Sequence, residues 1–220
     1  TPSYAEAHIW LGWVWLCLGH PNNGLGFSER AVELNPLTPA FRVFLAENYL
    51  AQGRVDDALR QARRARAIQP EYGLTHFMEG LVLYHQGRLV AAASALQQAL
   101  SGIPPRGTPT HAEVQAGLAV MHAVAGDTSQ TRTLLDQIDE TDAPFSAGLV
   151  HAALGDSDAA FDAFERVRTW GTFETEHIRY FFPDVLGPLR NTPRYDALIR
   201  RVNRAWGLRP DGLLPKTDAE

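Results

Sequence analysis

The chain has 220 residues, of which 45% are hydrophobic and 20% are charged. These proportions are those of a folded globular protein rather than of a disordered or collagen-like chain. The formal net charge of −5 argues against a dedicated nucleic-acid binder, which needs a basic face to hold phosphate. The single cysteine, Cys17, excludes an internal disulfide framework and a zinc site built on several thiolates, and we expect it to be a small buried residue.

The start of the chain holds its most apolar run, residues 9–18. This run is about half as long as the roughly 20 residues that a helix needs to cross a bilayer. The residues before it include Glu6 and no Lys or Arg, unlike the basic leader of a signal peptide. We therefore expect no membrane anchor and a cytoplasmic location. Because the sequence begins at Thr1 rather than at Met, we also expect it to be a piece of a longer polypeptide.

Three sets of residues recur every 34 positions along the first half of the chain. They are Gly19, Gly53 and Gly87; Ala31, Ala65 and Ala99; and Pro36, Pro70 and Pro104. Each period contains an apolar stretch, a glycine, an alanine-rich stretch and a proline, which predicts a hairpin of two helices. The small residues Gly24, Ala58 and Ala92 are expected where two helices approach closely.

Thr-Pro pairs predict the first turns of several helices. Thr can accept hydrogen bonds from the free amides of a first turn, and Pro at the first helical position loses no hydrogen bond. The pairs are Thr1-Pro2, Thr38-Pro39, Thr108-Pro109 and Thr192-Pro193.

The three periods resemble the tetratricopeptide repeat family. Residues 5–36 match its pattern with Leu11, Gly12, Trp15, Gly24, Ala31 and Pro36. Residues 39–70 match it with Leu45, Ala46, Tyr49, Ala58, Ala65 and Pro70, and residues 73–104 with Gly80, Leu83, Ala92, Ala99 and Pro104. The sequence departs from the family at His8, Arg42 and His76, which replace an early Trp, and at Glu79, which replaces Leu. The resemblance implies an all-α fold in which helical hairpins stack into a right-handed superhelical solenoid.

The second half of the chain is less regular. Residues 112–139 and 144–168 predict two degenerate hairpins, and residues 188–201 resemble the closing segment of bacterial multidomain regulators that carry such repeats. This closing segment predicts a capping helix, because a terminal hairpin cannot cover its own end. Its apolar stripe comprises Tyr195, Leu198, Ile199, Val202 and Trp206. The expected organisation is three regular hairpins in residues 1–104, two degenerate hairpins in 105–170, a capping segment in 171–209 and a flexible tail in 210–220.

The resemblance also implies a binding surface, because the first helix of each repeat lines a concave groove in this family. The residues carried over to this surface are Ile9, Trp10, Trp13, Val43, Phe44, Glu47, Phe77, Met78, Leu81 and Tyr84, with Leu16 and Leu50 beside them. None of them is basic or an amide, so the clamp that some members use for an acidic C-terminal tail is absent. The surface is almost entirely apolar, and about half of these side chains are expected to pack between helices instead.

Several occupants of such a surface remain open. Large exposed apolar patches are uncommon on monomers, so we expect this one to be covered. The main expectation is a protein-protein interaction scaffold that binds a hydrophobic or amphipathic peptide or helix of a partner, or a domain of the same polypeptide. One alternative is self-association through Trp10 and Trp13. Another is a regulatory or sensor region of a longer bacterial enzyme or transcription regulator, with a small hydrophobic ligand enclosed near Leu81 and Tyr84.

No catalytic residue, metal ligand or cofactor is expected. The signatures of zinc metalloproteases, serine hydrolases and P-loop enzymes do not occur in the sequence. His122 and His151 occupy equivalent positions of the last two hairpins and could share a metal, but we favour a packing role. The cluster of Glu174, Glu176 and His177 has no nucleophile beside it, so we expect a solvated helix start there.

Two runs of arginine, in residues 60–66 and 190–204, are also present. Such runs are usually solvated helix faces, so we do not expect nucleic acid as a partner.

Overall fold

The computed structural model describes residues 4–103, 111–209 and 211–212, and all of its regular elements in these ranges are helical. Five hairpins come first: α1 (Ala5–Cys17) with α2 (Pro21–Leu34), α3 (Pro39–Ala51) with α4 (Val55–Ile68), α5 (Gly73–His85) with α6 (Leu89–Gly102), α7 (His111–Val124) with α8 (Thr128–Leu135), and α9 (Pro144–Ala153) with α10 (Ser157–Arg166). Then come α11 (Thr172–Glu176), a π-helical turn η1 (His177–Phe181), α12 (Pro183–Leu186), a 3₁₀ turn η2 (Gly187–Leu189) and α13 (Pro193–Ala205). The all-α prediction is confirmed.

A glycine with positive φ joins the two helices of every hairpin. The five are Gly19, Gly53, Gly87, Gly126 and Gly155, with φ between +71° and +90°. A residue with a Cβ is strained in this region, which explains why glycine recurs at the turn. The same turn therefore persists in the last two hairpins, where the 34-residue spacing is lost.

Small residues lie where the paired helices cross. Ala31, Ala65 and Ala99 are fully buried. A Cβ added at Gly24 of α2 would collide with the carbonyl of Gly12 of α1, so the two helices are close enough for their backbones to touch. Larger side chains at these positions would push the helices apart.

Two of the polar residues that replace the family's early Trp fix the boundary between repeats. Arg42 donates from its Nε to the carbonyl oxygen of Pro36 at 3.0 Å, and Nε2 of His76 lies 2.6 Å from the carbonyl oxygen of Pro70. Both contacts span six residues, so two different side chains satisfy the same backbone group one repeat apart.

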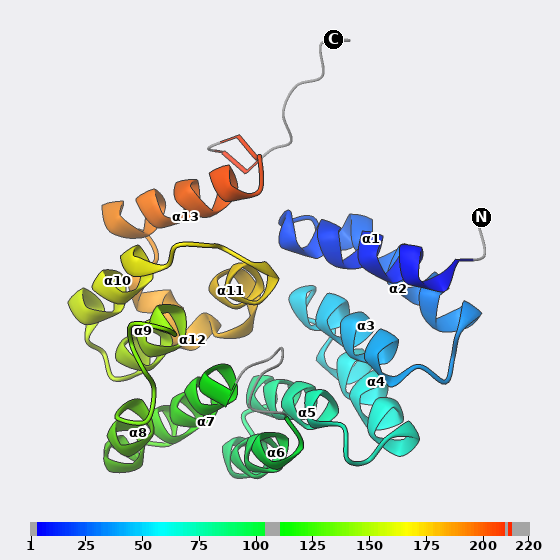
Figure 1. Cartoon of the computed structure of the whole chain (residues 1–220), viewed down its shortest axis with the longest axis horizontal. Helices are drawn as coiled ribbons and strands as arrows, with labels where there is room; N and C mark the ends of the chain where they lie inside the picture. Colours follow the sequence, from blue (N-terminus) through cyan, green and yellow to red (C-terminus); the bar gives the residue numbers. More distant parts are fainter. Residues whose placement is uncertain (1–3, 104–110, 210, 213–220) are drawn as a thin grey trace.

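The hairpins follow one another along an arc, and the chain then turns to the inside of that arc (Figure 1). There α11 contacts α1, η1 contacts α3, and α12 packs against α9. The concave side of the solenoid is therefore filled by the chain itself.

The expected capping helix is α13, and it packs on α10. Leu198 and Val202 of the predicted stripe are buried, and Tyr195, Ile199 and Trp206 are partly buried against the main core. Arg194 joins α13 to the last hairpin through Asp162 and Glu165, at 2.7 and 2.9 Å. Much of the C-terminal arginine run thus serves internal packing.

The Thr-Pro prediction holds in part. Thr192 caps α13 by accepting a hydrogen bond from the amide of Tyr195 at 3.2 Å. Pro39 is the first residue of α3, but the side chain of Thr38 makes no capping hydrogen bond, so that role was wrongly predicted. Thr1-Pro2, Pro104, Thr108-Pro109 and most of the expected tail lie outside the described residues.

Candidate functional site

The concave surface is the candidate site, and most of it is covered. Of the ten residues expected to line it, seven are buried. These are Ile9, Val43, Glu47, Phe77, Met78, Leu81 and Tyr84, and the neighbouring Leu16 and Leu50 are buried as well. Trp10 is 50% exposed, whereas Trp13 and Phe44 are partly exposed.

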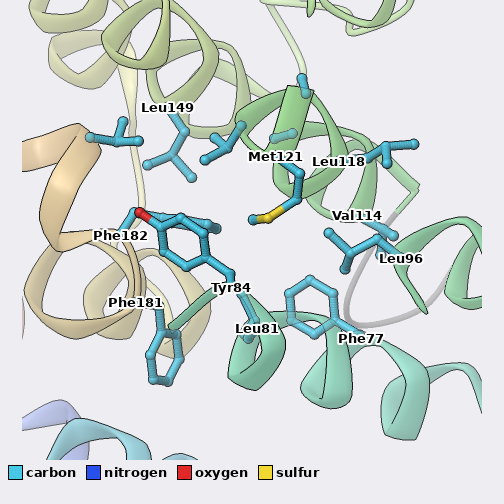
Figure 2. Packing of buried hydrophobic residues seen from close by; sticks show 14 of the residues in the cluster. Phe77, Leu81, Tyr84, Leu96, Val114, Leu118, Met121, Leu149, Phe181 and Phe182 are labelled. Carbon is cyan, nitrogen blue, oxygen red and sulfur yellow. The ribbon is translucent and has the colours of Figure 1, made fainter. Parts of the chain in front are cut away.

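Aromatic contacts fill the part of the surface that α5 provides. The ring of Phe77 lies 6.0 Å from that of His177, and the ring of Tyr84 lies 5.6 Å from that of Phe182, centroid to centroid. Figure 2 shows Phe181 and Phe182 beside Tyr84 and Leu81. The side chains of the chain itself therefore occupy the space in which a small hydrophobic ligand was considered.

Two polar contacts attach α5 to the residues that cover it. The hydroxyl of Tyr84 donates to a carboxylate oxygen of Asp184 at 3.5 Å. Nε2 of His85 lies 3.0 Å from the carbonyl oxygen of Phe181. These two neighbours on α5 thus contact the side chain of Asp184 and the backbone of Phe181.

Two buried carboxyl groups, those of Glu47 and Glu176, face each other where α1 and α3 meet residues 172–181. Glu176 accepts a hydrogen bond from the thiol of Cys17, with 3.3 Å between Sγ and Oε1. Burial raises the pKa of Glu47 to about 8. Burial and the neighbouring Glu47 raise the pKa of Glu176 well above its usual range. Burial, and then Glu176, raise the pKa of the Cys17 thiol, so the thiol is protonated.

This arrangement corrects one prediction. Glu176 and His177 were expected at a solvated helix start, yet both are buried, as is Thr175 between Gly171 and Trp206. One signal for this burial is present in the sequence, the aromatic run that follows at residues 180–182. The place of this segment on the inside of the arc depends on contacts with residues up to 159 positions away, which no local pattern encodes.

An aromatic cluster forms the open rim of the concave surface. The centroid of the Trp13 ring lies 5.0 Å from that of Phe44 and 5.2 Å from that of Trp10. These rings connect α1 to α3 and are tilted relative to one another, a favourable geometry for aromatic pairs. The cluster is the part of the predicted groove that solvent still reaches.

The outer face of α1 exposes further apolar side chains, Leu11 at 47% and Val14 at 42%. One repeat later these positions are occupied by Leu45 and Asn48, and both are buried. Asn48 is covered by α2, because its Nδ2 donates to Oγ of Ser28 at 3.1 Å.

The third repeat gives the same result. There the equivalent positions are Glu79 and Val82, both buried, and Glu79 pairs with Arg66 of α4 at 2.8 Å. In the second and third repeats, then, the preceding hairpin covers the face that α1 leaves open. We call the exposed face of Trp10, Leu11 and Val14 the end face.

The two histidines of the last hairpins each face a carboxylate. Nδ1 of His122 lies 3.6 Å from Asp127, and Nε2 of His151 lies 3.2 Å from Glu140. In the described part of the chain, no three His, Cys, Asp or Glu residues are grouped as a metal site requires.

Of the helices in this part, none has the length and apolar character to cross a membrane.

Comparison with known proteins agrees with the geometry. The model of the family described as "Tetratricopeptide repeat" matches residues 27–73 and 45–109. This part of the chain carries tetratricopeptide repeats. The matched segment covers the second and third hairpins, in which the 34-residue spacing is regular. No curated protein sequence matches the chain.

Solved structures of other proteins share its fold. TTC0263 of Thermus thermophilus, a thermophilic tetratricopeptide repeat protein, is 21% identical with a TM-score of 0.62, over 93% of this chain and all of that one. PilF of Pseudomonas aeruginosa is 15% identical with a TM-score of 0.57, over 91% of this chain and 90% of that one. A chain of the APC/C Cut9-Hcn1 hetero-tetramer is 14% identical with a TM-score of 0.59, over 93% of this chain and 41% of that one. At these identities the likeness concerns the fold alone.

Proposed function

We propose that this tetratricopeptide repeat chain is a protein-interaction module that binds an amphipathic helix of a partner protein through its end face and aromatic rim. The observation that carries the proposal is the exposure of Leu11 and Val14 at positions that are buried in the next two repeats. In the second and third repeats a preceding helical hairpin covers the equivalent face, which favours a helix as the complement of the end face. No catalytic role is proposed.

The energy available at this surface is modest. Burying a large apolar side chain contributes roughly 1.5–3 kcal/mol. Trp10, Leu11 and Val14 are already about half buried, so covering the rest of these three side chains would contribute on the order of 2–5 kcal/mol before the costs of association are subtracted. These three side chains alone therefore support an affinity weaker than micromolar, and contacts with Trp13 and Phe44 are needed to strengthen it.

The deeper groove residues have a conditional role in this proposal. Phe77, Met78, Leu81 and Tyr84 are buried, and residues 177–184 cover Phe77 and Tyr84, so a partner reaches them only if that segment moves. In the closed conformation the partner contacts Trp10, Trp13 and Phe44 from the predicted groove.

Paired substitutions test the proposal. Val14→Asp places a charge in the proposed contact, whereas Val90→Asp places one at a valine of α6 that is 88% exposed and lies outside that contact. Proteins that co-purify with the wild-type chain from its native host should be lost from Val14→Asp and kept by Val90→Asp, with unchanged circular dichroism. Equal retention by the two variants would contradict the proposal.

Self-association through the end face is the competing proposal. Sedimentation velocity over a concentration range of about two orders of magnitude distinguishes it, because a second copy on the end face would give a dimer that Val14→Asp abolishes. A concentration-independent monomer leaves the end face to a different protein.

A further inference from the structure

We propose that the contact between the inner faces of α1 and α3 and residues 172–181 is a seam that opens with rising pH and uncovers the concave side of α1 and α3. This device goes beyond the proposed function, since it concerns how much of the surface a partner can reach. We call the two sides the N-terminal side, α1 and α3, and the inner segment, residues 172–181.

The seam joins parts of the chain that are far apart in sequence. On the N-terminal side it is made by Cys17 and Glu47, and on the other by Glu176. Near the end of α1, the guanidinium of Arg179 packs against Gly19, where an added Cβ would lie 3.3 Å from one of its nitrogens. No covalent bond crosses this contact, because Cys17 is the only cysteine.

The inner segment is held firmly on its other sides. The hydroxyl of Tyr195 donates to the carbonyl oxygen of Ile178 at 3.1 Å, and Nε1 of Trp206 donates to Oγ1 of Thr175 at 2.8 Å. Arg179 donates to Oδ1 of Asn203 at 2.5 Å. When the seam opens, the inner segment therefore stays with α13, and the first two hairpins move away from it.

Hydrogen bonding at the seam is also incomplete. Oε2 of Glu47 and Nε of Arg179 are buried, and neither atom has a hydrogen-bond partner among the residues that the structure describes. Leaving a buried polar atom without a partner is unfavourable, and solvation in the open form removes this penalty. Residues 177–181 form a π-helical turn, a rare element that is frequently found at functional sites. These features weaken the seam.

Charge determines how the seam responds to pH. Glu176 faces Cys17 from α1 and Glu47 from α3, with Tyr180 and Arg179 beside it on its own segment. Tyr72, just before α5, faces Glu47. Arg179 is the one cation in this set, and its hydrogen bond goes to Asn203 rather than to either carboxylate. Ionisation of both acids would therefore put two like charges into a buried contact.

The sign of the pH effect follows from linkage. Burial raises the pKa of Glu47 from 4.5 to about 8 in the closed form, and solvation in the open form restores the lower value. The closed form is therefore most stable below pH 4.5 and loses that stability between pH 4.5 and 8. For each proton that opening releases, the equilibrium ratio of open to closed form rises about tenfold per pH unit in this window.

Cys17 is a built-in reporter, because its thiol is fully buried and lies against Glu176. The rate at which Ellman's reagent labels the full chain should be measured from about pH 5.5 to about pH 8 and divided by the rate for free glutathione at each pH. The corrected rate of the wild type should rise between about tenfold and about a hundredfold per pH unit, as one or both acids release a proton, and that of the double variant Glu47→Gln/Glu176→Gln should stay nearly constant. Both substitutions keep the shape of the neutral acids, and circular dichroism checks that the variant folds.

Controls separate seam opening from unfolding. Glu33→Gln, which removes an exposed acid of α2, should label like the wild type. Small-angle scattering should show a larger radius of gyration for the wild type at about pH 8.5 than at about pH 5.5, and no change for the double variant. The proposal is overturned if the wild type and the double variant have the same corrected pH dependence. It is also overturned if the labelling rate of Cys17 depends on urea concentration in the same way as global unfolding, because Cys17 would then be exposed only in the unfolded chain. These measurements need no partner, so they can fail while the proposed function stands.

Discussion

The thiol of Cys17 donates a hydrogen bond to the carboxyl group of Glu176, which lies 159 positions further along the chain. This contact joins the first helix of the solenoid to the segment that fills its concave side. It explains why a lone cysteine and an acidic residue are both buried at a surface otherwise lined by apolar side chains. Because the thiol and the carboxyl are both protonated, the contact adds no net charge to the interior.

The crossing of α1 and α2 gives a matched pair of stability predictions. Gly24→Ala places a Cβ against the carbonyl of Gly12 and should lower the free energy of unfolding by about 1–3 kcal/mol. Gly26→Ala, in the same helix, meets open space and should raise it by about 0.5–1 kcal/mol. Urea denaturation of both variants checks the pair, and two changes of the same sign would contradict this helix packing.

The end face gives a second matched pair. Leu45→Ala removes a buried side chain and should cost about 2–5 kcal/mol of unfolding free energy. Leu11→Ala, at the equivalent position of the first repeat, should cost less than about 1 kcal/mol, because Leu11 is half exposed. Denaturation midpoints measure both effects. A large loss in Leu11→Ala would mean that this face is already covered in the isolated chain.

The capping helix gives a prediction that depends on salt. Arg194 pairs with Asp162 and Glu165 and stacks over the ring of Phe161 at 4.9 Å. Arg194→Ala should lower the unfolding free energy at low salt and lower it less in about 1 M NaCl, because exposed ion pairs are screened. Arg200→Ala, an exposed arginine of the same helix, is the control and should change the stability little. Urea denaturation at the two salt concentrations measures the effect, and a salt-independent loss would assign it to the ring contact alone.

The buried acid of α3 gives a prediction for pH. A raised pKa in the folded state means that stability falls as the pH rises from 4.5 towards 8. Glu47→Gln should therefore match the wild type near pH 4.5 and exceed it by up to about 4 kcal/mol near pH 8. Thermal or urea unfolding at the two pH values measures the difference, and a variant that is less stable at both would show that the carboxyl has a different role.

The hairpins could be predicted from the sequence because their determinants are local. Gly53 and Gly87 mark turns that need positive φ, and Ala65 and Ala99 mark close helix crossings. The capping helix could be predicted in the same way, since Leu198 and Val202 lie on one helical face. These features depend on residues within one or two turns of each other.

The occupant of the concave side could not be predicted in this way. Glu176 and His177 are polar and follow a threonine, which is typical of a solvated helix start. Their burial depends on Cys17, Glu47 and Phe77, which arrive from three different helices. The apolar composition of the expected groove indicated that something must cover it, but no periodicity in the sequence identifies the covering segment.

Hydroxyl-radical footprinting with mass spectrometry reports whether the chain fills its own concave side and leaves the aromatic rim and end face open. After correction for intrinsic reactivity, Trp10 should be labelled strongly in mildly acidic buffer, and Phe77, Tyr84 and Phe182 should be protected. Labelling of Phe77 and Tyr84 as strong as that of Trp10 would mean that the groove is open, and would contradict the account.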